Sequence, residues 1–124
     1  MSLELKSTLS EAPNFVPHRV VSDANETTFD TERKHGMNGD LYNEAIVQVI
    51  PDAGVTPTVD VLFWSEAAAK FIPDQTPITK AGSVGGQAFS FSFPILGRVF
   101  LVRVTAGLSL GKSVRIDCAG HREQ

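Results

Sequence analysis

Residues 98–120 constrain the fold most, because apolar and polar residues alternate along them with a period of two. The apolar residues share one side in each half of the stretch: Phe100, Val102 and Val104 in the first, and Val114, Ile116 and Cys118 in the second. Such alternation is typical of strands with one buried and one solvated face. A glycine-containing loop joins the two halves, so we expect a β-hairpin.

The charges of this expected hairpin predict its register. If the turn is centred near Leu110, Arg103 lies opposite Asp117 and unlike charges pair across the strands. A centre at Ser109 would set Arg103 against Arg115, and like charges directly opposite each other are unfavourable. We therefore expect Arg103 to face Asp117.

Similar short patterns cover most of the chain. Strands are expected at residues 15–21, 27–29, 42–50, 58–64, 69–72 and 88–93, in addition to the two above. The total is about seven to nine strands with turn signals roughly every ten residues, which predicts an all-β, antiparallel β-sandwich of jelly-roll-like form. We expect an extended arm at residues 1–14, the sandwich domain at 15–120 with a long connection at 74–87, and a polar tail at 121–124.

Composition excludes several classes of function. The 124 residues fit one domain, and 42% hydrophobic residues are enough for a core without disulfides or metal. A net charge of −3 gives no basic surface for nucleic acid or an anionic membrane. No apolar run reaches bilayer length and the N-terminus lacks an apolar signal region, so we expect synthesis in a cytoplasm without secretion.

One stretch imitates a nucleotide-binding motif. Residues 106–113 (AGLSLGKS) loosely match a P-loop, whose phosphate-binding amides belong to a helix that opens at the Lys-Ser pair. Here Ser113 instead begins an alternating strand. We therefore interpret the stretch as a tight loop with a solvated Lys112, and the glycine-rich residues 81–86 as a loop as well.

The remaining reactive side chains form no recognisable catalytic or metal-binding pattern. His18, His35 and His121 are far apart and lack ligand spacing, so neither a metal site nor a cofactor is expected. Cys118 lies on an apolar strand face and is expected to be an inert buried thiol. We expect a protein that is not an enzyme.

The interface candidates are apolar residues outside the clearest core pattern. Residues 58–64 (TVDVLFW) are apolar on both sides, which indicates that the outer face is covered too. Trp64, Tyr42 and Leu62 could form a subunit interface, a sugar-stacking platform or simple core, and these alternatives stay open. Leu3, Leu5 and Leu9 of the arm are further candidates for an interface.

The order of these patterns resembles the small β-sandwich virion proteins of tailed bacteriophages. The resemblance is carried by Val59-Asp60-Val61, by residues 98–105 (RVFLVRVT) and by Val114–Ile116 after a glycine-containing loop, and it covers residues 42–120. It implies a capsid decoration (cement) protein at the capsid surface, a homotrimer that bridges neighbouring major capsid subunits. The alternatives are another head, tail or fibre component, or a carbohydrate-binding or adhesin module.

Overall fold

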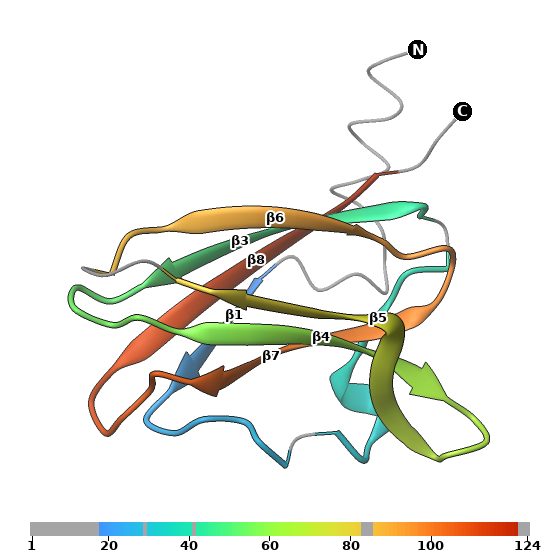
Figure 1. Cartoon of the computed structure of the whole chain (residues 1–124), viewed down its shortest axis with the longest axis horizontal. Coiled ribbons are helices and arrows are strands. Elements are labelled where there is room, and N and C mark those ends of the chain that lie inside the picture. Colours follow the sequence, from blue (N-terminus) through green and yellow to red (C-terminus); the bar gives the residue numbers. More distant parts are fainter. Residues whose placement is uncertain (1–17, 29, 41, 83–85, 122–124) are drawn as a thin grey trace.

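The computed structural model describes residues 18–28, 30–40, 42–82 and 86–121, and its strands form two antiparallel four-stranded sheets (Figure 1). In the first sheet the spatial order is β1 (His18–Ser22), β8 (Ser113–His121), β3 (Glu44–Pro51) and β6 (Phe89–Pro94). In the second sheet it is β2 (Met37–Asn38), β7 (Val99–Ala106), β4 (Thr58–Ser65) and β5 (Lys70–Ala81). A short 3₁₀ turn, η1 (Arg33–His35), precedes β2.

The order of the strands is that of a jelly roll. Among the described strands, only β4 and β5 are consecutive in sequence and adjacent in one sheet, and every other connection passes from one sheet to the other. This winding produces two interlocked Greek keys from eight strands. The expected all-β antiparallel sandwich of jelly-roll form is therefore confirmed.

The predicted hairpin between β7 and β8 is wrong. The two strands belong to different sheets, and Arg103 of β7 lies opposite Asp60 of β4, not opposite Asp117. Asp117 instead faces Gln48 of β3 and His18 of β1. The loop arches across the core, so the apolar faces of β7 and β8 meet each other from opposite sheets rather than lying side by side.

The predicted inward faces of the individual strands are confirmed. Along β3, β4, β7 and β8 the alternate apolar residues are buried in one cluster between the sheets: Ala45, Val47, Val49, Val59, Val61, Phe63, Phe100, Val102, Val104, Val114, Ile116 and Cys118. Phe93 of β6 contacts the opposite sheet. Its ring lies edge-on to the rings of Phe63 and Phe100, with ring centroids 6.0 and 5.4 Å apart.

Strand β5 is longer than the sequence indicates. Its second half, Ile78 onward, pairs with the first half of β4, so the expected long connection at 74–87 is in part a strand. Residues 74–77 bulge out between the two paired halves, and the strand bends sharply there (Figure 1). The expected strand at 27–29 is not formed at Thr27 and Thr28, while residue 29 and the arm at 1–14 lie outside the described residues.

The outer face of the second sheet is covered, as the pattern of residues 58–64 indicated. Leu62, Phe71 and Leu101 form a second buried cluster there, with Trp64 and Val99 packed against it. The covering loop, residues 23–28 and 30–36, crosses this face: the amide of Phe71 donates to the Asp30 carbonyl at 2.8 Å. A Cβ on Gly36 would lie 2.9 Å from the Phe100 carbonyl oxygen, so the loop passes too close for a side chain.

Candidate interaction surfaces

The structure divides the sequence-based interface candidates. Tyr42 and Leu62 are buried within the protomer, in the main and the outer cluster respectively. Trp64 is partly exposed, with its ring edge-on to Phe71 at 5.1 Å and its Nε1 donating to Glu66 at 2.5 Å. Leu3, Leu5 and Leu9 lie outside the described residues.

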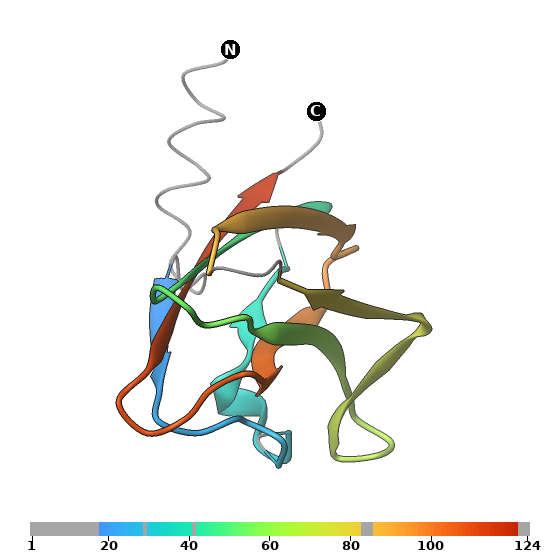
Figure 2. The same ribbon diagram turned by 60° about the vertical axis from the view of Figure 1, so that its left-hand side comes forward.

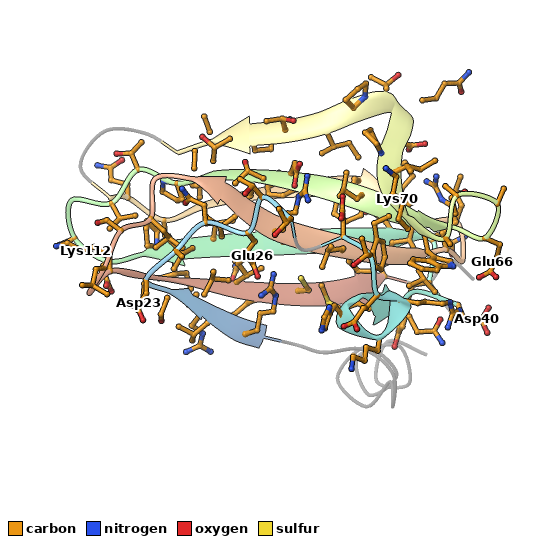
Figure 3. The ribbon with its side chains drawn as sticks, turned by 90° about the horizontal axis from the view of Figure 1, so that it is seen from below. Asp23, Glu26, Asp40, Glu66, Lys70 and Lys112 are labelled. Atoms are coloured by element: carbon orange, nitrogen blue, oxygen red, sulfur yellow. The ribbon has the colours of Figure 1, made fainter. Side chains whose placement is uncertain are left out.

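One side of the sandwich is closed by ionic and backbone contacts. Arg19 of β1 donates to both carboxylate oxygens of Glu26, at 2.9 and 2.7 Å, and to the Val102 carbonyl of the opposite sheet at 2.7 Å. The Glu26 amide in turn donates to the Val104 carbonyl at 2.6 Å, and the Val104 amide donates to the Glu26 carboxylate at 3.1 Å. These contacts occupy the edge of β7 and fix the covering loop near the middle of the sandwich, where Glu26 lies in Figure 3.

Arg103 of β7 also binds the covering loop and connects it to β4. Its guanidinium forms two hydrogen bonds with the Asp60 carboxylate, at 3.0 and 3.3 Å, and lies 3.7 Å from Asp30. It also donates to the Thr27 carbonyl at 3.4 Å. Arg103 therefore pairs with an opposite charge across the strands, as expected. Its partner is Asp60 of β4, however, and not Asp117.

The opposite side of the sandwich is open. A groove of about 680 Å³ lies there between residues 74–80 of β5 and residues 92–94 of β6, and Leu96 and Arg98 complete its lining. Both strands are outermost in their sheets, as Figures 1 and 2 show. The prolines at 73, 77 and 94 are the sequence signal for these edges, because proline cannot donate to a central ladder and is confined to edge strands.

Arg98 organises one end of the groove. Its guanidinium donates to the Ile95 carbonyl at 2.8 Å and to the Pro94 carbonyl at 3.2 Å. It also donates to both oxygens of Asp74, at 3.1 and 3.4 Å, and lies 3.7 Å from the centre of the Phe63 ring. These hydrogen bonds from Arg98 lower the pKa of the Asp74 carboxyl, helped by the amide of Gln75. Arg98 thereby ties the bulge of β5 to the turn that follows β6.

The outer face of the first sheet is exposed. Val20, Ile46 and Ile50 project from it with 57%, 44% and 39% of their surface accessible. Across the ladders these residues are flanked by Ser92, Ala119 and Arg115, and Arg115 is paired with Asp117 at 2.9 Å. A shallow hollow of about 260 Å³ lies at one end, lined by Gln48, Ile50, Ala88, Phe89 and Ser90. The face is therefore nearly neutral, with apolar side chains set among small polar ones.

The loop that resembles a P-loop has its amides occupied. The Gly111 amide donates to Asp23 at 2.9 Å and the Ser113 amide donates to Asp52 at 2.8 Å, so carboxylates stand where a P-loop would hold phosphate. Figure 3 shows Asp23 and Lys112 together at one end of the sandwich. Ser113 begins β8, as predicted, and no helix follows it within the described chain.

Cys118 is buried, as expected, and this burial raises the pKa of its thiol to about 12. A thiol that stays protonated is a poor nucleophile and a poor metal ligand. In the described part of the chain, no three His, Cys, Asp or Glu side chains gather in a way that could hold a metal ion. Nor does any described helix have the length and apolar character needed to cross a bilayer.

No protein-family model and no curated protein matches this chain.

Proposed function

We propose that this chain is a non-enzymatic virion structural protein, a capsid decoration (cement) protein that binds neighbouring major capsid subunits at the capsid surface and stabilises the shell. The observation that carries the proposal is the contrast between the two sheets. The covering loop and its buried cluster occupy the outer face of one sheet, whereas the other face leaves Ile46 and Ile50 exposed. Exposed apolar side chains in one patch are typical of protein–protein contact sites.

The electrostatics of this face fit a protein surface better than a polyanion. Arg115 is paired with Asp117 on the same strand, so the face presents little net charge. Serine and alanine beside the isoleucines allow another surface to approach closely. Capsid binding through this face would stabilise the shell by mass action, because a protein that binds only the assembled lattice disfavours its disruption.

The test measures binding to shells assembled from the major capsid protein of the virus that carries this chain. The wild-type protein is expected to co-sediment with the shells and to raise the temperature at which they break open. The double variant Ile46→Asp/Ile50→Asp should lose at least tenfold in affinity, since about 1.4 kcal/mol suffices for that loss. Leu110→Asp is the matched control, because Leu110 is 87% exposed on the loop before β8 and belongs to neither sheet.

Two results would contradict the proposal. Shells that leave the wild-type protein in the supernatant would exclude a cement role. Binding to glycans that is lost in Trp64→Ala, with no binding to shells, would favour the carbohydrate-binding alternative, because Trp64 is the partly exposed aromatic that could stack on a sugar.

A further inference from the structure

The dipeptide Asn38-Gly39 occurs once in the sequence and carries a reaction that needs no enzyme. The backbone nitrogen of Gly39 attacks the side-chain Cγ of Asn38. An N–Cγ bond forms, the Cγ–Nδ2 bond breaks, and ammonia leaves with the proton of the Gly39 amide, which gives a cyclic imide. Water then opens the ring at either carbonyl, so the products are aspartate and isoaspartate. Glycine favours this reaction, because no side chain hinders the approach of its nitrogen.

The packing of the fold keeps this reactive pair together. Gly39 is buried, and a Cβ there would collide with the Ile95 side chain and lie 2.7 Å from the Arg98 carbonyl oxygen. The Oδ1 of Asn38 accepts a hydrogen bond of 3.0 Å from the Asp40 amide, a turn that asparagine forms readily. Each residue therefore has a structural reason to be where it is, independent of the reaction between them.

The folded backbone restrains the attacking nitrogen. The Gly39 amide donates to the Arg98 carbonyl at 3.1 Å, and the Gly39 carbonyl accepts from the Tyr42 amide at 2.9 Å. The nitrogen must give up its proton to form the new bond, so a hydrogen bond donated through that proton opposes the reaction. The contact between Asn38 and the Asp40 amide restrains the other reacting group as well. Asn38 should therefore react when the bond between Gly39 and Arg98 is broken.

The strand that carries Asn38 is the shortest in its sheet. Strand β2 has two residue pairs with β7, and the described residues place no other strand beside it. Short edge elements open locally at a lower free energy than central strands do. The bond from Gly39 to the Arg98 carbonyl directly follows the pair of Asn38 with Val99, so opening of β2 releases it.

We propose that Asn38 is a site of spontaneous deamidation, that opening of β2 from β7 limits its rate, and that the isoaspartate product prevents β2 from pairing again. Isoaspartate routes the main chain through the side-chain carbon and so adds one atom between residues 38 and 39. Met37 and Gly39 then cannot both keep their places along β7. Residues 30–36 of the covering loop lead directly into β2, so the modified chain holds this end of the loop less firmly.

The first test follows the reaction itself in the purified full chain and does not depend on the proposed function. Mass spectrometry of the peptide that contains residue 38 detects the replacement of the side-chain amide by a carboxyl during incubation at pH 8. The folded chain should react at least about tenfold more slowly than the chain unfolded in urea. Asn38→Ser, which keeps a short oxygen acceptor for the Asp40 amide, should show no mass gain in either state.

Two results of this test would overturn the proposal. An unfolded chain without a mass gain at residue 38 would exclude the site. Equal rates in the folded and the unfolded chain would show that the fold does not limit the reaction.

A pair of cavity variants tests whether β2 opens by itself. Met37 is 5% exposed beside Asn38, so Met37→Ala loosens β2 without altering the reacting pair. Leu108→Ala is the matched control, because Leu108 is 8% exposed on the loop between β7 and β8. That loop also carries Lys112, which lies at the opposite end of the sandwich from Asp40 in Figure 3.

The Met37 variant should deamidate at least about threefold faster than the wild type, and the Leu108 variant should stay within about twofold of it, because the rate tracks the population of the open form. Equal acceleration in both variants would show that the reaction follows global unfolding, and the assignment to β2 would fail. The comparison of folded and unfolded wild-type chains remains decisive if Met37→Ala does not fold.

The last test concerns the product. Anion-exchange chromatography separates the modified chain, which carries one more negative charge than the unmodified chain. The isoaspartate fraction should unfold at a lower temperature than the unmodified fraction. Equal unfolding temperatures would refute the claim that the modification keeps β2 from pairing.

Discussion

Replacing Arg98 by methionine should destabilise the sandwich, because this side chain holds several partners at the open edge. The side chain is only one-third exposed and makes five contacts at once: the Ile95 and Pro94 carbonyls, both oxygens of Asp74, and the face of Phe63. Methionine keeps the length and apolar stem of the side chain but removes every one of its donors. The loss is therefore electrostatic rather than a loss of volume.

The magnitude follows from these contacts. Each carbonyl hydrogen bond contributes about 0.5–1.5 kcal/mol. A partly exposed ion pair adds about 0.2–1 kcal/mol, and a cation above an aromatic ring adds about 0.5–1 kcal/mol. We expect Arg98→Met to lower the free energy of unfolding by about 2–5 kcal/mol in total.

Urea denaturation followed by tryptophan fluorescence measures this loss, with Arg115→Met as the matched control. Arg115 is 53% exposed, and its ion pair with Asp117 lies on the solvated face. Its replacement should lower the free energy of unfolding by less than about 1 kcal/mol. If the two variants lose the same free energy, Arg98 does not tie the bulge of β5 to the turn after β6, and the reasoning fails.

Three further predictions follow from single residues. The Arg98 hydrogen bonds lower the pKa of folded Asp74 below its ordinary value of 3.8, so their stabilisation is complete above that pH and is lost as the pH falls through the lowered pKa. Acid titration of the unfolding free energy should therefore be flatter in Asp74→Asn below about pH 4, and an unchanged slope would contradict the assignment. Cys118, whose thiol pKa burial raises to about 12, should not react with a disulfide reagent at pH 8 until urea unfolds the chain, and fast labelling of the native protein would show that the thiol is accessible. Gly36→Ala should cost about 1–3 kcal/mol, measured by thermal unfolding, because its Cβ would collide with the Phe71 ring under the covering loop.

The strands themselves were predictable because their periodicity is local. The inward faces of β3, β4, β6, β7 and β8 follow from residues two apart, and a period of two is the same whichever partner a strand has. For the same reason the hairpin prediction failed. An arch between sheets and a hairpin within one bury identical side chains, and the choice depends on β1, β3 and β4, which compete for the edges of β7 and β8 from distant parts of the chain.

The surfaces were harder to predict than the strands. Tyr42 and Leu62 look like interface residues in the sequence, but the covering loop and the opposite sheet bury them within one protomer. The role of Arg98 cannot be predicted from the sequence, because a side chain that reaches to Asp74, 24 residues away, leaves no periodic pattern. Pro73 and Pro77 are typical of an edge strand, but they are equally typical of a loop. The sequence therefore does not predict that β5 continues from Ile78 onward.

The jelly-roll arrangement determines which strand pairs can form while the chain is still being synthesised. In each sheet a central strand is among the last two made: β7 lies between β2 and β4, and β8 lies between β1 and β3. While the nascent chain still lacks residues 99–121, β1 and β3 have no neighbour between them, and β2 has no ladder at all. Neither sheet is complete until this region is made, so a ribosome that stops before it releases a chain in which only β3 can pair with β6 and β4 with β5, and such open strand edges are prone to aggregate.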